Sequence, residues 1–104
     1  MTIQEFKALL LTIDPNAKHY KHSSTGNYTV WAEYNKTFEV ADDKIHSGLL
    51  FVQVDRYTKT EYDPMVDAIT AGLDVSHVFI RDRRTIYEND TGYIHHIWDL
   101  EVMQ

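Results

Sequence analysis

Apolar and polar side chains alternate along the C-terminal segment of the chain, residues 94–102. One side of an extended backbone there carries Ile94, His96, Trp98, Leu100 and Val102. A period of two is typical of a half-buried antiparallel strand. Residues 89–92, Asn-Asp-Thr-Gly, precede the strand and have the composition of a turn. We therefore predict that this segment is a strand, with Trp98 buried against the first helix.

Two segments show helical spacing instead. Thr2 and Glu5 have the spacing of a capping box, and the apolar periodicity that follows stops at Asp14, just before a proline. This predicts a first helix over residues 3–13. Asp63 as the cap and Pro64 in the first turn predict a second helix over residues 64–73.

The remaining strands are predicted from β-branched and aromatic runs. Residues 28–34 form one strand, with Trp31 on the opposite face from Tyr28, Val30, Ala32 and Tyr34. Residues 49–58 carry apolar side chains on both faces at their start, which indicates a central strand. A third strand, residues 77–87, is interrupted by the charged run 81–84, which predicts a bulge or a protruding bend.

The connections are predicted to be irregular. Residues 14–26 and 41–48 are expected to be loops, residues 35–36 a tight turn, and residues 37–40 a briefly paired segment. The element order is then α-β-β-α-β-β. We predict an α+β fold, a mostly antiparallel four-stranded sheet with two helices packed on one face, in a single domain over residues 1–104.

Charge and length exclude some classes of function. The formal net charge is −6, whereas a nucleic-acid binder normally presents a basic face. No apolar run approaches the roughly 20 residues of a membrane-spanning helix. We therefore expect neither a membrane association nor sequence-specific binding to nucleic acid.

Catalytic and metal-binding motifs are not apparent. The chain has no cysteine and no H-E-x-x-H pattern, and its four glycines do not cluster. His95 and His96 are adjacent on a strand, so they face opposite sides of the sheet. An enzyme that uses His77, His95, Asp99 and Glu101 is an alternative that spacing alone does not support. We predict no catalytic residues, no cofactor and no metal.

The aromatic residues suggest an interface more strongly than a catalytic site. A domain of this size cannot bury all of them, and Tyr and Trp are favoured where proteins meet. Our candidate interface residues are Trp31, Tyr34, Phe38, Arg81, Arg83 and Arg84. The loop at residues 35–48 is expected to become ordered on assembly.

Three segments resemble small proteins encoded among the head–tail joining genes of long-tailed bacteriophages of Gram-positive hosts. They are residues 28–33 (YTVWAE), 54–64 (VDRYTKTEYDP) and 87–96 (YENDTGYIHH). The predicted element order is also similar to that of the tail terminator, or tail completion, proteins of such phages. Members of that family form rings of six copies that cap the tail tube and meet the head connector.

The resemblance implies a non-enzymatic structural protein of the virion, made in the host cytoplasm and assembled into a homo-hexameric ring at the head–tail junction. Its expected partners are copies of itself, the major tail protein and head connector proteins. Two alternatives stay open. One is a head-side connector or minor capsid protein, and the other is a phage-encoded adaptor that binds a host protein through exposed aromatic side chains.

Overall fold

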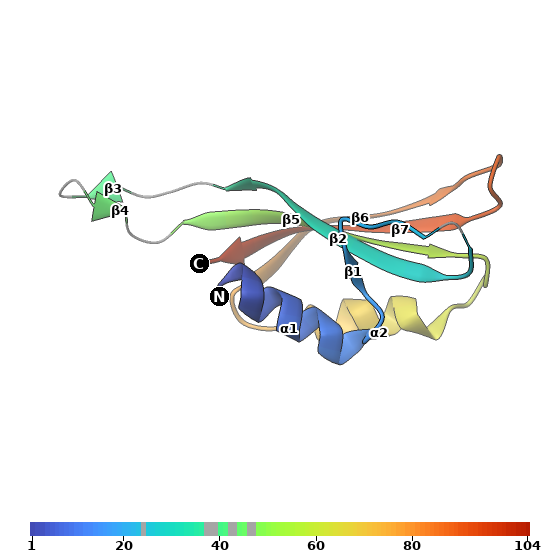
Figure 1. Cartoon of the computed structure of the whole chain (residues 1–104), viewed down its shortest axis with the longest axis horizontal. Helices are drawn as coiled ribbons and strands as arrows, with labels where there is room; N and C mark the ends of the chain where they lie inside the picture. Colours follow the sequence, from blue (N-terminus) through green and yellow to red (C-terminus); the bar gives the residue numbers. More distant parts are fainter. Residues whose placement is uncertain (24, 37–39, 42–43, 46–47) are drawn as a thin grey trace.

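A twisted sheet carries both helices on one of its faces, and a small hairpin lies beyond one end of that sheet (Figure 1). This computed structural model describes residues 1–23, 25–36, 40–41, 44–45 and 48–104, and the molecule is elongated, 52 × 25 × 21 Å. The two ends of the chain adjoin, because the amino group of Met1 donates to the carbonyl of Met103 at 2.7 Å.

Both helices begin as the sequence predicts. Helix α1 spans Ile3–Ile13, and Thr2 and Glu5 exchange the two hydrogen bonds of a capping box. Helix α2 spans Pro64–Gly72, and the Asp63 side chain accepts from the amide of Met65. Each cap satisfies amides that the first helical turn leaves without partners.

The main sheet has five strands rather than four, in the order β1-β2-β5-β7-β6. Its strands are β1 (Lys18–His19), β2 (Tyr28–Lys36), β5 (Leu49–Thr58), β6 (Val78–Tyr87) and β7 (Ile94–Met103). β5 is central, as predicted, and its neighbours β2 and β7 run antiparallel to it. The prediction of a mostly antiparallel α+β fold with helices on one face is therefore right at the level of class.

The structure differs from the prediction mainly in the segments that were predicted to be loops. β1 lies within residues 14–26 and pairs in parallel with Val30 and Trp31 of β2, so the sheet is mixed. Residues 35–36 continue β2 instead of forming a tight turn, because an irregularity after Glu33 lets the strand keep pairing with β5. Two-residue strands β3 (Val40–Ala41) and β4 (Lys44–Ile45) pair with each other, where residues 41–48 were predicted to be a loop. Val40 belongs to the segment 37–40 that was predicted to pair briefly, and the rest of that segment lies outside the described residues.

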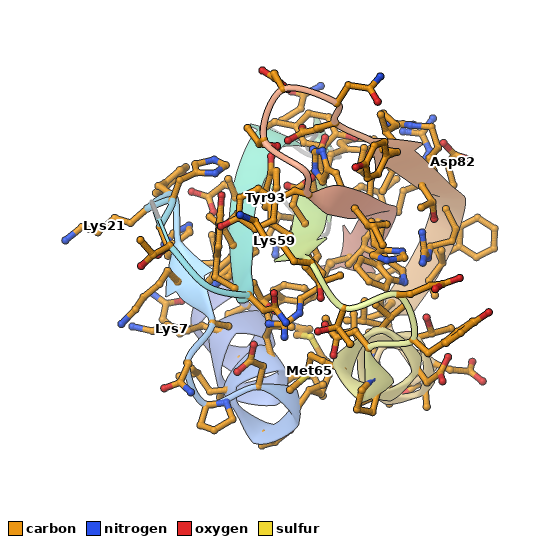
Figure 2. The ribbon with its side chains drawn as sticks, turned by 90° about the vertical axis from the view of Figure 1, so that its right-hand side faces the viewer. Lys7, Lys21, Lys59, Met65, Asp82 and Tyr93 are labelled. Atoms are coloured by element: carbon orange, nitrogen blue, oxygen red, sulfur yellow. The ribbon has the colours of Figure 1, made fainter. Side chains whose placement is uncertain are left out.

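The core lies between the helices and the sheet. Phe6 and Leu10 of α1 and Ile69 of α2 are fully buried against one face of β2, β5 and β7. That face includes Trp31, whose ring meets Phe6 edge-on at a centroid distance of 5.3 Å. Figure 2, which looks along the sheet from the end opposite the β3–β4 hairpin, shows Met65 between the two helices.

Trp98 is buried on the predicted face of β7, but it contacts a different helix from the one expected. Its indole N–H donates to Thr70 of α2 at 3.1 Å, and its neighbour in the sheet is Val54 of β5. The alternation along β7 predicted which way the side chain points. It carried no information on which helix lies above that part of the sheet.

A buried charge network ties both helices to the sheet. Arg56 of β5 lies 3.5 Å from the carboxylate of Asp14 at the end of α1 and 2.9 Å from that of Asp63 at the start of α2. It also donates to Thr29 of β2 at 3.1 Å.

Among the residues that the structure describes, no helix is long and apolar enough to cross a membrane.

Candidate functional site: the helix-free face of the sheet

The face of the sheet opposite the helices, here called the open face, carries the features most suggestive of function. It receives every second side chain of β2, β5, β7 and β6. The strand registers place Tyr28, Tyr57 and His95 in one row across it, and Phe51 and Glu101 in another near the β3–β4 end. Apolar side chains are therefore present on both sides of this sheet, although helices cover only one.

Four aromatic rings gather at the end of the open face near the β6–β7 turn. Tyr28 stacks on Tyr57 at a centroid distance of 4.9 Å, and Tyr57 stacks on His95 at 4.0 Å. Tyr93 meets both Tyr28 and Tyr57 edge-on, at 5.9 and 5.8 Å. We call these four residues the hairpin-end cluster, after the hairpin that β6 and β7 form.

Two carboxylates hold the imidazole of this cluster. Nε2 of His95 lies 2.7 Å from Oδ1 of Asp55, and Nδ1 lies 3.4 Å from Oε2 of Glu88. Gln53 donates to the same Asp55 oxygen at 2.9 Å. Because both ring nitrogens face an anion, the ring has a fixed orientation against Tyr57.

The buried surroundings also act on the phenols. Burial, with the negative charge of Asp55 beside it, raises the pKa of Tyr57 to about 12. Burial likewise raises the pKa of Tyr28. Both groups therefore stay neutral and can serve as hydrogen-bond donors, but neither is activated as a base or a nucleophile.

Loops around the cluster are fastened to it. The hydroxyl of Tyr93 donates to the carbonyl of Gly26 at 2.8 Å, and the ammonium of Lys59 lies 4.9 Å from the Tyr93 ring centroid. Figure 2 shows these two side chains close together at the end of the sheet that faces the viewer. Asn27 accepts from the amide of Lys59 at 2.9 Å. The cluster thus joins three separate parts of the chain at one end of the molecule.

A second apolar patch lies at the opposite end of the open face, next to the β3–β4 hairpin. Tyr34 and Phe51 lie 6.1 Å apart between ring centroids, and the Arg81 guanidinium lies 5.3 Å from the Phe51 ring. Phe79 of β6 lies in the same row across the sheet as Phe51, with Glu101 between them, and is 64% exposed. We call these four residues the arm-end patch, where the arm is the β3–β4 hairpin.

The charged groups of the open face largely neutralise one another. Arg81 lies 3.3 Å from Glu101, and Arg84 contacts Asp82 at 2.5 Å and Asp99 at 3.2 Å. Arg81 and Asp82 are consecutive, but the register shift between Ile80 and Asp82 brings both to this face. The predicted bulge in the charged run is thereby confirmed.

The structure separates the predicted interface residues into three groups. Tyr34, Arg81 and Arg84 lie on the open face. Trp31 is 2% exposed in the core, so it cannot contribute to a surface. Arg83 points to the helix side, where its guanidinium lies 4.3 Å from the Trp98 ring, and Phe38 lies outside the described residues.

The four residues of the enzyme alternative are not brought together. His95 pairs with Asp55 and Glu88, whereas Asp99 and Glu101 pair with arginines. His77 precedes β6, at the end of the sheet far from His95. Within the described ranges, no group of three or more His, Asp or Glu side chains is placed to hold a metal ion.

Sequence reasoning missed Asp55 and Glu88, the two partners of His95. A signal for Asp55 existed, because it falls on the same face of its strand as Tyr57 and is an acidic residue in a largely apolar run. Glu88 precedes a turn, where a carboxylate is ordinary. Only the pairing of β5 with β7 brings the first carboxylate to the imidazole.

Comparison with known proteins adds no assignment to this geometry. The chain matches no protein-family model and no curated protein sequence.

Proposed function

We propose that this chain is a non-enzymatic structural protein of a tailed-phage virion, and that it forms a ring at the head–tail junction. The proposal rests on where three segments of the chain lie in the folded protein. The three segments that resemble head–tail joining proteins, residues 28–33, 54–64 and 87–96, supply all four rings of the hairpin-end cluster. Three segments that are far apart in the sequence therefore lie together in the folded protein.

The arm-end patch and the β3–β4 hairpin give the proposal its assembly surfaces. A closed ring needs two different surfaces on each copy, because each copy contacts its neighbours head to tail. The arm-end patch offers large exposed side chains beside charges that are already paired, which lowers the cost of covering it. The β3–β4 hairpin lies beyond the body of the protein, within reach of a neighbouring copy (Figure 1).

In this proposal, the partners are further copies of the chain, the major tail protein on one side and head connector proteins on the other. The chain is made in the host cytoplasm and ends in the virion. No catalytic step is assigned, because His95 and the two raised-pKa tyrosines are committed to contacts within the cluster.

Localisation in the particle tests the proposal. The chain has no cysteine, so Lys21→Cys introduces a single thiol at an exposed position whose side chain points away from the body (Figure 2). Gold attached to that thiol should appear at one end of purified tails in electron micrographs. Protein that stays free in infected cells and is missing from particles would refute the assignment.

Particles that lack the protein distinguish the tail side from the head side. Full heads with unjoined or overlong tails support a ring that terminates the tail tube. Heads that leak DNA would instead indicate a connector or minor capsid protein. Normal particles with an altered host response would point to the adaptor alternative and would overturn the structural role.

A further inference from the structure

The second half of β6 has an open backbone edge, because β6 is the last strand on its side of the main sheet. The amide of Glu88 donates to the carbonyl of Tyr93 at 2.8 Å, so the backbone of Glu88 faces the chain of β7. Since these directions alternate along a strand, the N–H and C=O groups of Thr85 and Tyr87 face outward. Among the described residues, these outward groups have no backbone partner.

The usual protection of an edge strand is weak along this half of β6. Proteins protect such edges with bulges and with charges that project into solvent. The bulge of β6 lies before Asp82, so the strand beyond it is regular. Arg84 is turned back onto its own sheet by its ion pair with Asp99 at 3.2 Å. Ile86 and Tyr87 are 48% and 61% exposed, so apolar side chains adjoin the open edge.

The order of side chains along this half makes it complementary to itself. Arg84, Ile86 and Glu88 follow one another on the open face, where Arg84 meets Asp99 and Glu88 meets His95. When two copies run antiparallel with Ile86 at the centre, the two Ile86 side chains face each other. Each Arg84 then faces Glu88 of the other copy, and opposite charges in this position stabilise a sheet.

Other symmetric alignments of the two strands are less favourable. A centre at Arg83 or at Arg84 places two arginines opposite each other, and a centre at Thr85 places Asp82 opposite Glu88. Like charges in directly opposed positions destabilise a sheet. The charges therefore select both the partner, a second copy of the same strand, and its alignment.

We propose that two copies of this chain pair through residues 84–88, antiparallel about a two-fold axis at Ile86. Thr85 of each copy exchanges backbone hydrogen bonds with Tyr87 of the other, because the groups of both residues face outward. The two Ile86 residues form a pair without hydrogen bonds, the position at which opposed side chains are closest. The contact leaves Phe79 and the rest of the arm-end patch free, so it goes beyond the proposed ring and does not compete with it.

Single thiols test the alignment, because the chain has no cysteine of its own. Ile86→Cys should form a disulfide-linked dimer under mild oxidation, since opposed Cα atoms about 4.5 Å apart suit a disulfide. Asp90→Cys, exposed at the turn of the same hairpin, is the control and should link much more slowly. In a mixture, Thr85→Cys should link to Tyr87→Cys in preference to itself. Equal rates for Ile86→Cys and Asp90→Cys, or a preference of Thr85→Cys for itself, would overturn the proposal.

Charge reversal tests the same contact without a thiol, with dissociation constants measured by sedimentation equilibrium. Arg84→Glu and Glu88→Arg should each weaken the dimer about tenfold. A mixture of the two variants should recover the parent affinity, because every glutamate then faces an arginine. Lys21→Glu, the same charge reversal at an exposed position away from β6, should change nothing.

Three results of the sedimentation experiment would overturn the proposal. They are a parent chain that stays monomeric at millimolar concentration, a dimer that Arg84→Glu does not weaken, and a mixture that associates no more tightly than either variant alone. None of these outcomes depends on whether the protein enters a virion. Cross-linking at Ile86→Cys in a protein that is missing from particles would refute the ring and leave this contact in place.

Discussion

Trp98 joins β7 to α2, and it is fully buried with its N–H satisfied by Thr70. Truncation to alanine would leave a large cavity at this point of the core. We expect Trp98→Ala to lower the free energy of unfolding by about 3–5 kcal/mol, a large share of the total for a domain of this size. Denaturant titration followed by far-ultraviolet circular dichroism measures the loss.

Glu101→Ala is the matched control on the same strand. Glu101 forms a half-exposed ion pair with Arg81 on the open face, and such pairs contribute less than about 1 kcal/mol. The variant should unfold almost as the parent does. If Glu101→Ala proved the more damaging change, the two faces of β7 would be assigned the wrong way round.

Asp63 makes the protein sensitive to acid. Burial alone would raise its pKa, but hydrogen bonds from the amide of Met65 and from Arg56 outweigh it, so the pKa lies below its ordinary value. The unfolded chain therefore takes up this proton first as the pH falls. The stabilisation is complete above the ordinary pKa of an aspartate and is lost as the pH drops through the folded value.

We expect the free energy of unfolding to fall between about pH 5 and pH 2, and Asp63→Asn to flatten that part of the profile. Asp74→Asn, which removes an exposed carboxylate beyond the end of the same helix, should leave the profile as it is. An unchanged slope in Asp63→Asn would show that other carboxylates cause the acid sensitivity.

At the scale of the elements, Gly72 of α2 leaves room for the side chain of Ile13 of α1. A Cβ atom there would lie 2.4 Å from Cδ1 of Ile13 in α1. Gly→Ala in a helix ordinarily gains about 0.5–1 kcal/mol, but this overlap should cost more, since overpacking costs about 1–3 kcal/mol. We therefore expect Gly72→Ala to destabilise the protein and to stabilise the Ile13→Ala variant, a sign reversal that a double-mutant cycle detects. Additive effects would mean that the helices are farther apart.

The elements that sequence analysis predicted are those that pattern and caps define. The capping box of α1, the Asp63 cap and Pro64 of α2, and the alternation along β5 and β7 give bounds close to those observed. β1 was missed because two polar residues, Lys18 and His19, form too short a run to show a period. The site was harder to predict, because a period of two assigns a residue to a face but does not say which strand lies beside it. Asp55 and His95 meet only through that pairing.

At the scale of the whole molecule, the open face should matter for assembly rather than for folding. Tyr34 and Phe79 are exposed, at 54% and 64%, so Tyr34→Ser with Phe79→Ser should change the free energy of unfolding by only about 0.5 kcal/mol for each substitution. The same pair should prevent incorporation into particles. Tyr62→Ser, at an even more exposed position away from the open face, is the control and should assemble normally. Normal assembly of the double variant would remove the arm-end patch from the proposed interface.

The place of β7 in the sheet has a consequence for the timing of folding during synthesis. In the described part of the sheet β6 borders only β7, and β7 is made after β6 and after both of the strands that lead up to it, β2 and β5. β2 and β5 can pair as soon as they emerge, but β6 must wait without a neighbour until residues 94–103 have been made. A nascent chain halted before that point would leave one edge of the apolar strand β5 unpaired and open to other chains. Completion of the sheet therefore follows completion of this segment, and interrupted synthesis should yield aggregates rather than shorter folded proteins.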